Sequence, residues 1–528
     1  MALPVSDFLS GYAAAFPDKL GVQEGDTVLD YAELNRRANR VAAVLVDLGV
    51  RSGTKLVWCG QNGLEVVVLV HAARKAGAVA VPLNYRLTPE EAAYVIDNSD
   101  STVVLFDVEQ AEQLQLAPAA CPKVAHWVAF RCAADAVPDW AEHLESLAAE
   151  ASDAEVSPVP APAGSGGDSS AEDAGATMIY TSGTTGKPKG ALRRGGDPAV
   201  AAALIGHIGF STDDVYLTTG PLYHSGPLGF MGIVQALGGS VVVQRHFEPA
   251  AWLGLVQRHR ITTTFSAPTP LRRVLDLPED VRSRYDTSSL ERVVANAAPW
   301  PFELKRRYVE AFGATSLWEV YGSTELGVNT VLRPEDQMRK PGSCGRPAPM
   351  VEVTLLDDDG GTVEGVGEPG ELFVRSAYAF DTYYKAEEKY EESRRGEWLT
   401  VGDVAYRDEE GFLYICDRKK DMIISGGMNI YPAEIEAVLV SHPAVADAAV
   451  FGVPSEEWGE GVHAVLELRP GTEAADDELD TFARRHLASY KVPRSWTRIP
   501  EIPRTGSGKI LKRELRAPFW EGRSSAVG

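Results

Sequence analysis

Apolar residues between positions 30 and 49 recur three or four positions apart, which places them on one face of a helix. Asp30 and Glu33 at the start of this stretch resemble a capping box, and Gly49 is a typical stop signal. The pattern predicts an amphipathic helix that packs its apolar face against a core. The apolar positions are Leu34, Ala38, Val41, Leu45 and Leu48.

Short apolar runs alternate with helical patterns through much of the chain. Because parallel strands need a crossover connection that is usually a helix, this order favours a parallel sheet covered by helices. Strands are predicted at residues 55–59, 78–82, 102–106, 216–219, 241–244, 262–265 and 290–295. Helices are predicted at residues 64–76, 229–237 and 249–259, and from Thr88 onward.

The chain of 528 residues is too long for one hydrophobic core. A charged run at 417–421 follows a strand-like stretch at 411–415, so we predict a large domain of residues 1–417 and a small one of residues 418–528. Apolar alternation and a helical pattern in the last hundred residues predict strands at 446–450 and 462–468 and a helix at 476–487. The expected fold class is α/β, with a large N-terminal domain of mixed and parallel sheets and packed helices, plus a small mobile α+β C-terminal domain.

Charge and composition exclude several classes of protein. The formal net charge of −23 argues against binding to nucleic acid or to an anionic membrane. The most apolar window, 64–83, carries Glu65, Arg74 and Lys75 and predicts no membrane span. The five cysteines form neither a Cys-x-x-Cys pair nor a zinc-spaced cluster, so reduced thiols are expected. With no signal-peptide pattern at the N-terminus, we expect a soluble cytoplasmic protein.

Residues 180–190 read Tyr-Thr-Ser-Gly-Thr-Thr-Gly-Lys-Pro-Lys-Gly, directly after the apolar residues 176–179. Glycines let backbone N–H groups approach an anion, and hydroxyls and lysines add donors and positive charge. A P-loop would have Ser or Thr after its lysine, whereas Lys187 is followed by Pro188. The run therefore predicts a phosphate-binding loop of another kind, with a nucleotide triphosphate as its ligand.

This loop resembles the signature loop of the adenylate-forming superfamily, which contains acyl-CoA synthetases, luciferases and the adenylation domains of peptide synthetases. Four further motifs occur in the family's order as far as position 509. The resemblance implies that ATP and a carboxylate give an acyl-adenylate and pyrophosphate, and that a thiol then attacks the adenylate. ATP contacts are expected from Thr181, Ser182, Gly183, Thr184, Thr185, Gly186 and Lys187.

The motif Tyr-Gly-Ser-Thr-Glu at 321–325 resembles the family segment at the nucleotide. By this resemblance Tyr321 covers the adenine with Gly322 beside it, Thr324 binds the α-phosphate, and Glu325 binds Mg²⁺. A hard cation prefers carboxylate oxygen, which fits the last role. Asp403 resembles the aspartate that accepts both ribose hydroxyls, although Val401 stands where the family commonly has threonine.

The segment 417–436 matches the family's hinge region almost throughout. The resemblance implies that Arg418 reaches the ribose or phosphates and that Lys420 is the hinge between domains. Ser425, Gly426 and Gly427 would line the tunnel for the pantetheine arm of coenzyme A, where glycine leaves room for a thin chain. Lys509, in a glycine-bearing loop, resembles the lysine that stabilises charge during adenylation.

His224 lies in Pro-Leu-Tyr-His-Ser-Gly, which resembles the motif where the acyl carboxylate meets the thiol. Ala297 and Ala298 resemble the segment that packs along adenine. Small and apolar residues near these motifs predict a roomy acyl pocket, and hence a bulky or long lipophilic acid. The pocket residues are His224, Gly226, Gly229, Phe230, Gly327 and Val328.

Two other stretches need an interpretation. Residues 151–176 consist largely of Ala, Ser, Pro, Gly, Asp and Glu, a composition typical of disorder. Since the family has a variable connection here, we predict a mobile surface loop within the large domain. Residues 365–370 fit Gly-x-Gly-x-x-Gly, but a strand-like run follows instead of a helix, so we predict a turn between strands.

The resemblance favours an acyl-CoA synthetase that uses ATP, Mg²⁺, coenzyme A and a small-molecule carboxylic acid, because no carrier domain adjoins the chain. Loading of a separate carrier protein and a non-catalytic nucleotide-binding scaffold are the alternatives. The sequence leaves the acid, the pathway (fatty acid or secondary metabolism) and a homodimeric state undetermined.

Overall fold

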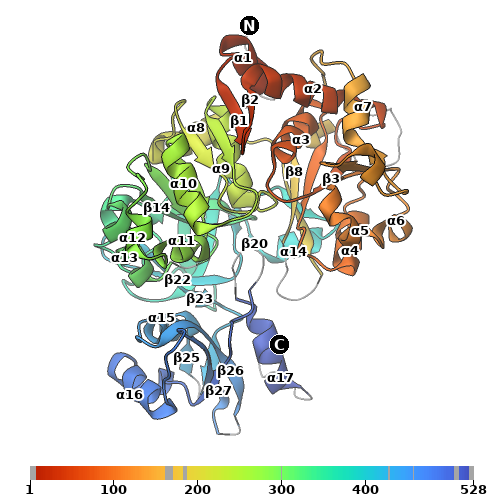
Figure 1. Cartoon of the computed structure of the whole chain (residues 1–528). Coiled ribbons are helices and arrows are strands. Elements are labelled where there is room, and N and C mark those ends of the chain that lie inside the picture. The colour runs from red at the N-terminus through yellow and green to blue at the C-terminus, as the bar shows by residue number, and fades with distance from the viewer. Residues whose placement is uncertain are drawn as a thin grey trace.

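The structure is a computed structural model that describes residues 7–160, 171–181, 187–298, 300–425, 428–455, 457–504 and 510–521. Its strands form sheets of nine, eight, six and five strands. The five-stranded sheet and its helices form a small body below the rest of the molecule in Figure 1. The predicted α/β fold, with a large N-terminal part and a smaller C-terminal part, is confirmed.

The eight-stranded sheet has the order β19-β9-β8-β4-β3-β5-β6-β7. Its central strands run parallel because helical crossovers join them, as the alternation predicted. They are β3 (Lys55–Cys59), β4 (Val79–Leu83), β5 (Val103–Asp107) and β6 (His126–Phe130), with α3 (Leu64–Lys75) and α4 (Pro89–Asn98). At one side β8 (Thr177–Thr181) and β9 (Lys189–Arg193) form an antiparallel pair.

The nine-stranded sheet has the order β16-β15-β14-β13-β12-β10-β11-β1-β2. Its parallel strands are β10 (Val215–Leu217), β11 (Ser240–Val243), β12 (Thr263–Ser266), β13 (Arg292–Ala295) and β14 (Leu317–Ser323). β15 (Gly327–Leu332) turns back antiparallel to β14. The N-terminal hairpin of β1 (Leu20–Glu24) and β2 (Thr27–Asp30) joins this sheet at β11. The α/β region thus consists of two sheets, the eight-stranded and the nine-stranded one.

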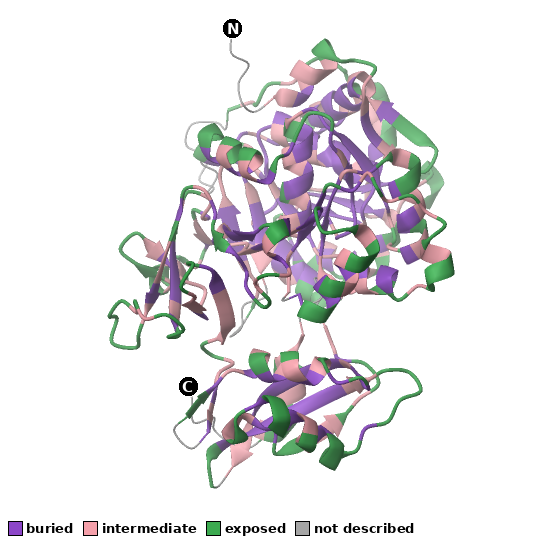
Figure 2. Ribbon diagram, turned by 90° about the vertical axis from the view of Figure 1, so that its left-hand side faces the viewer, coloured by how far each residue is buried: buried purple, intermediate pink, exposed green. Residues whose placement is uncertain are grey.

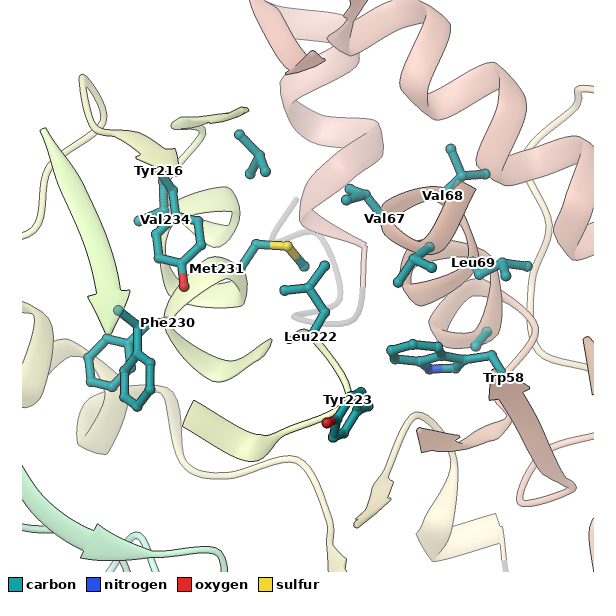
Figure 3. Packing of buried hydrophobic residues seen from close by; sticks show 14 of the residues in the cluster. Trp58, Val67, Val68, Leu69, Tyr216, Leu222, Tyr223, Phe230, Met231 and Val234 are labelled. Atoms are coloured by element: carbon teal, nitrogen blue, oxygen red, sulfur yellow. The ribbon is translucent and has the colours of Figure 1, made fainter. Parts of the chain in front are cut away.

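Helices from both sheets share one core between them. α2 (Tyr31–Asp47) packs on α3, and α3 faces α9 (Ser225–Ala236). In Figure 3, Met231 and Leu222 point toward Val67, and Trp58 closes the layer below. α9 begins four residues before the predicted position 229, because His224 has extended backbone angles and caps the helix. α10 (Pro249–His259) has the predicted bounds.

The capping box predicted at Asp30 is only half formed. Asp30 accepts a hydrogen bond from the backbone N–H of Glu33 at 2.7 Å. The Glu33 carboxylate does not return this bond and pairs instead with Arg36 and Arg37. Glu33 thus stabilises the first turns through ion pairs three and four residues along the helix.

The described parts of the 151–176 stretch, which was predicted to be a mobile surface loop, make specific contacts with the large body. Glu155 accepts hydrogen bonds from Asn35 at 2.6 Å and from the buried Lys75 at 2.8 Å. The carbonyl of Val159 accepts a hydrogen bond from Ser52 N at 2.8 Å, and Asp173 pairs with Arg194. Composition alone did not predict these contacts, which include the ion pair of Glu155 with the buried Lys75.

The six-stranded sheet links the large and small bodies. Its strands are β17 (Val351–Leu356), β18 (Gly370–Ser376), β20 (Arg394–Arg395), β21 (Trp398–Leu399), β22 (Asp403–Arg407) and β23 (Leu413–Arg418). The glycine run at 365–370 leads directly into β18, as predicted for a turn.

The small body has its own buried core, which appears in Figure 2 as a separate band of buried residues. β26 and β27 are longer than predicted because they form one long antiparallel ladder. Its elements are β24 (Ile423–Ser425), β25 (Met428–Ile430), β26 (Val445–Ser455), β27 (Gly459–Leu468), β28 (Ser495–Arg498), α15 (Pro432–Val440), α16 (Asp476–His486) and α17 (Lys512–Trp520).

Among the described residues, no helix combines the length and apolar character that a bilayer crossing requires. The five cysteines are free thiols, and Cys59, Cys121 and Cys344 are buried. Burial raises the pKa of the Cys344 thiol to about 12, which keeps it protonated.

Candidate active site

Strand ends from three sheets converge on the predicted nucleotide site. β14 of the nine-stranded sheet ends at Tyr321–Ser323, β8 of the eight-stranded sheet ends at Thr181, and β22 of the six-stranded sheet begins at Asp403. Side chains at the ends of strands point out of a sheet edge, where ligands of α/β proteins commonly bind. The predicted residues therefore come from distant parts of the sequence to one place.

Asp403 is buried between a hydrogen-bond donor and an ion-pair partner. The Tyr321 hydroxyl donates to its Oδ2 at 2.6 Å, and Arg418 Nε lies 3.3 Å from its Oδ1. The register of β22 on β23 places Arg418 directly opposite Asp403. Burial and the nearby Asp403 charge hold the pKa of Tyr321 well above its usual range, so its hydroxyl remains a donor.

Glu325 lies at a meeting point of two hydroxyl groups. Thr181 Oγ1 and the Tyr383 hydroxyl each donate to Glu325 Oε1 at 3.0 Å. The Glu325 backbone carbonyl accepts a hydrogen bond from Phe380 N at 2.7 Å. Tyr383 belongs to β19 (Thr382–Tyr384), which pairs with β9 beside the phosphate loop. The sequence interpretation missed Tyr383, because a tyrosine in a short isolated strand has no motif signal.

The carboxylate of Glu325 fits a Mg²⁺ ion that accompanies ATP. Magnesium is commonly held by one or two carboxylates together with substrate phosphates and water. In the part of the chain that the structure describes, no group of three or more His, Cys, Asp or Glu residues could hold a metal by itself. The single carboxylate of Glu325, hydrogen-bonded to Thr181 at the end of β8, fits an ion whose other ligands are phosphate oxygens and water.

Thr324 makes the next contact in the turn. Its hydroxyl lies 2.9 Å from Ser225 Oγ at the start of α9. Arg193, at the end of β9, donates to the Thr324 carbonyl at 2.8 Å and also to the Tyr378 carbonyl. This half-buried arginine links the turn of residues 323–325 to the neighbouring sheet. Neither Ser225 nor Arg193 was predicted, since their roles depend on the folded turn.

Close backbone packing shapes the same site. A side chain at Gly322 would overlap the carbonyl of Gly327 on the neighbouring strand, so only glycine fits there. Ala297 has a φ of 72°, a left-handed conformation that costs free energy for a residue with a Cβ. Asn296 Nδ2 donates to the Val320 carbonyl at 2.6 Å and holds this segment against β14.

A cavity of about 1120 Å³ opens from this cluster into the large body. It is lined by all six predicted acyl-pocket residues, and by Ala297, Gly322 and Thr324 from the predicted nucleotide site. Residues 501–504 of the small body also contribute to its wall. The acyl-pocket residues that line it are His224, Gly226, Gly229, Phe230, Gly327 and Val328.

Several predicted residues lie elsewhere or outside the described part of the chain. Lys187 Nζ lies 4.7 Å from the centroid of the Tyr94 ring. Ala298 follows β13. Ser425 is buried in β24 of the small body, and Lys420 is exposed just after β23. Outside the described residues are Ser182, Gly183, Thr184, Thr185, Gly186, Gly426, Gly427 and Lys509.

Comparison with known proteins decides the family. Residues 9–384 match the model of the AMP-binding enzyme family, and residues 434–509 match its C-terminal domain. The chain belongs to the AMP-binding enzyme family. It is 35% identical to feruloyl-CoA synthase of Amycolatopsis sp over 506 residues, which cover 95% of this chain and 96% of the relative. It is 32% identical to 2-succinylbenzoate–CoA ligase of Bacillus subtilis (strain 168) over 518 residues, 97% of each chain.

A solved structure of this family gives the same fold. The anthranilate CoA ligase AuaEII, in complex with anthranoyl-AMP, superimposes with a TM-score of 0.86 at 26% identity and covers 98% of both chains. The predicted family and the predicted enzyme class, an AMP-forming acid–thiol ligase, are confirmed by these relatives.

Proposed function

We propose that this AMP-binding enzyme joins a long or bulky, largely apolar carboxylic acid to coenzyme A, using ATP and releasing AMP and pyrophosphate. The observation that carries the proposal is the cavity of about 1120 Å³ that begins at Thr324 and Ser225 and extends along α9. Acetate would fill only a small part of the space along α9, even though the cavity also takes in Ala297, Gly322 and Thr324 of the predicted nucleotide site.

In the proposed adenylation step, a carboxylate oxygen of the acid attacks the α-phosphorus of ATP, and pyrophosphate leaves. Asp403 accepts both ribose hydroxyls, and Arg418 adds positive charge beside it. Asp403 is suited to this role because it is buried, and its two partners fix the direction of both carboxylate oxygens. The ring of Tyr321, held by the same bond, covers the adenine.

In this proposal, the phosphates of ATP lie between the 181–187 loop and the turn at Thr324. Thr324 donates to the α-phosphate, and Glu325 holds the Mg²⁺ that neutralises phosphate charge when bound. The hydroxyls of Thr181 and Tyr383 both donate to Oε1 and so orient the Glu325 carboxylate. Lys509 adds positive charge at the α-phosphate as pyrophosphate leaves.

The second step needs a different arrangement of the two domains. We assign residues 1–417 to the domain that holds ATP and the acid, and residues 418–528 to a mobile domain that turns about Lys420. Ser425, Gly426 and Gly427 then line the pantetheine tunnel of coenzyme A. The thiolate sulfur attacks the acyl carbonyl near His224, the new C–S bond forms, and AMP leaves with the electron pair of the broken C–O bond.

The test is acid-dependent exchange of labelled pyrophosphate into ATP. Purified protein with MgATP is assayed against acetate, aromatic acids and a series of fatty acids. Exchange should be strongest with large acids and weak with acetate. If acetate or propionate proves the best substrate, the cavity argument is wrong.

The acceptor is tested separately, because a carrier protein could replace coenzyme A. Addition of coenzyme A to a preformed acyl-adenylate should give acyl-CoA with loss of the adenylate. Exchange without this product would favour loading of a carrier protein. Tight ATP binding without exchange for any acid would favour a non-catalytic nucleotide-binding scaffold.

A further inference from the structure

The cavity runs along α9 from Ser225 to Ala236. Met231 of the same helix points toward Val67 of α3 in Figure 3, so that side of α9 belongs to the core. Gly229 and Gly232 have open space where a Cβ atom would lie. The α9 residues that line the cavity are Ser225, Gly226, Pro227, Leu228, Gly229, Phe230, Gly232, Ile233 and Ala236.

The length of α9 gives an estimate of the length of the cavity. Ser225 to Ala236 spans about 16 Å at 1.5 Å per residue. An extended chain advances roughly 1.2 Å per bond, as an extended peptide does. An acid whose carboxylate lies beside Thr324 would therefore reach the Ala236 end with about a dozen bonds.

Helix α1 (Phe8–Ala15), near the N-terminus, lies beside the Ala236 end of α9. Phe8 of α1 lines the cavity, as do Val70 and Arg74 of α3. Two contacts hold α1 and α3 against the end of α9. The Tyr12 hydroxyl donates to the Ala236 carbonyl at 3.2 Å, and His71 Nε2 lies 3.1 Å from Gln235 Oε1. The chain thus places the Arg74 cation beside the cavity near this end of α9, in addition to the cavity-lining cations Arg86 and Arg193.

The guanidinium of Arg74 lies over the Phe8 ring, 4.8 Å from its centroid. No hydrogen bond or ion pair joins it to another described residue. Its neighbour Lys75 differs, because Lys75 Nζ contacts Asp7 at 3.0 Å, Glu155 at 2.8 Å and Ser10 at 2.8 Å. These contacts already occupy the nearest carboxylate, Asp7, which also accepts hydrogen bonds from Ser10.

We propose that Arg74 binds a second anionic group at the far end of the substrate, so that the preferred acid is a long α,ω-dicarboxylic acid. The inference rests on the proposed function, because it assumes that the α9 channel holds the acyl chain. The guanidinium offers a planar set of donors that matches a carboxylate in bidentate geometry. A chain of about a dozen bonds is long enough for one carboxylate to lie beside Thr324 while the other lies beside Arg74.

The electrostatic surroundings of Arg74 support this role. Burial lowers the pKa of Arg74, and the negative charge of Asp7 offsets only part of that shift. The neighbouring His71 carries no charge at neutral pH, since burial lowers its pKa to about 3. A carboxylate beside Arg74 would supply the charge-matched acceptor that its described neighbours do not.

The experiment compares kcat/KM in pyrophosphate exchange for tetradecanedioic acid, its monomethyl ester and tetradecanoic acid. The wild-type protein should favour the diacid over both others by about tenfold to a hundredfold, the usual effect of a buried charge-assisted hydrogen bond. Arg74→Met should abolish this preference while keeping exchange with tetradecanoic acid, which also shows that the variant folds. Arg74→Lys should restore part of it.

Two further variants serve as controls. Arg86→Met removes another cavity-lining cation, which lies over Tyr85, and should leave the diacid preference unchanged. Gly232→Leu fills the channel part-way and should impair all three long substrates but spare an acid of about six carbons. If the wild type prefers tetradecanoic acid, or Arg74→Met leaves the ratio unchanged, the inference is wrong although the proposed function stands. If no acid supports exchange, the proposed function itself fails.

Discussion

The Tyr321 hydroxyl donates to Asp403 Oδ2 at 2.6 Å across the junction of two sheets. Tyr321 lies in β14 of the nine-stranded sheet, whereas Asp403 begins β22 of the six-stranded sheet. The bond therefore connects the proposed adenine contact with the proposed ribose contact. Since β22 leads through β23 to Arg418 and Lys420, it also connects the nucleotide site with the proposed hinge.

Asp403→Ala should lower pyrophosphate exchange by about two orders of magnitude or more, because a charge-matched contact to the nucleotide is lost. Tyr321→Phe keeps the ring and removes only the hydroxyl, so the loss should be about tenfold or less and fall mainly on KM for ATP. Both variants should still fold, with Asp403→Ala the less stable of the two, because it leaves the Tyr321 hydroxyl and Arg418 without their acceptor. Wild-type exchange in Asp403→Ala would remove this residue from the site.

Glu325→Gln keeps the shape of the side chain and removes its charge. We expect exchange to fall about a hundredfold or more and the Mg²⁺ requirement to shift to higher concentration. Tyr383→Phe, which removes one orienting hydroxyl, should lower exchange by less than Glu325→Gln does. A Mg²⁺ titration of exchange measures both effects, and an unchanged titration curve in Glu325→Gln would rule out the metal role.

Two glycines of α9 should respond in opposite ways to alanine. A Cβ at Gly226 would overlap the Phe265 ring, whereas a Cβ at Gly232 meets nothing within 4 Å. Gly226→Ala should lower the melting temperature, and Gly232→Ala should leave it unchanged or raise it, since alanine favours a helix by about 0.5–1 kcal/mol over glycine. Adding Phe265→Leu should recover part of the loss in Gly226→Ala. Equal melting temperatures for the two alanine variants would contradict this packing.

Domain alternation predicts that two lysine variants separate the half-reactions. Lys420→Pro fixes φ at the hinge, so exchange should stay within roughly tenfold of wild type while thioester formation from preformed acyl-adenylate is mostly lost. Lys509→Ala should fail in exchange and still convert supplied acyl-adenylate with coenzyme A. Parallel loss of both half-reactions in both variants would instead indicate a fixed cleft.

The ion pair of Glu155 with Lys75 predicts a pH-dependent stability. Burial pushes the pKa of Glu155 up, but hydrogen bonds from Lys75, Asn35 and Ser10 outweigh it and hold the value at about 2. A depressed carboxyl pKa stabilises the fold above the unfolded value near 4.5 and loses that effect as the pH falls toward 2.

Glu155→Gln should therefore melt a few degrees below wild type at pH 7, with a difference that shrinks below pH 4.5. Glu150→Gln, at an exposed end of α7 (Leu144–Glu150), is the control and should melt like the wild type at both pH values. A constant difference across this pH range would show that the contribution is not ionic.

Local patterns predicted elements well, and long-range pairing poorly. The helix at 249–259 and the strand at 55–59 follow from periodicity alone. The attachment of β1 to β11 joins residues more than 200 positions apart, and no local signal specifies it. Likewise, the proposed roles of Asp403 and Glu325 come from the resemblance, whereas the contacts of Tyr383 and Arg193 depend on strand register. The contact of Glu155 could not be predicted either, since composition does not reveal its buried partner Lys75.

The most direct test of the account follows oxygen from the acid to the nucleotide. A suitable long-chain acid labelled with ¹⁸O in its carboxylate is incubated with the protein, MgATP and coenzyme A, and the products are analysed by mass spectrometry. Attack of the carboxylate on the α-phosphorus predicts acyl-CoA together with AMP that carries one ¹⁸O atom. Formation of ADP, or of AMP without the label, would contradict an acyl-adenylate mechanism for this chain.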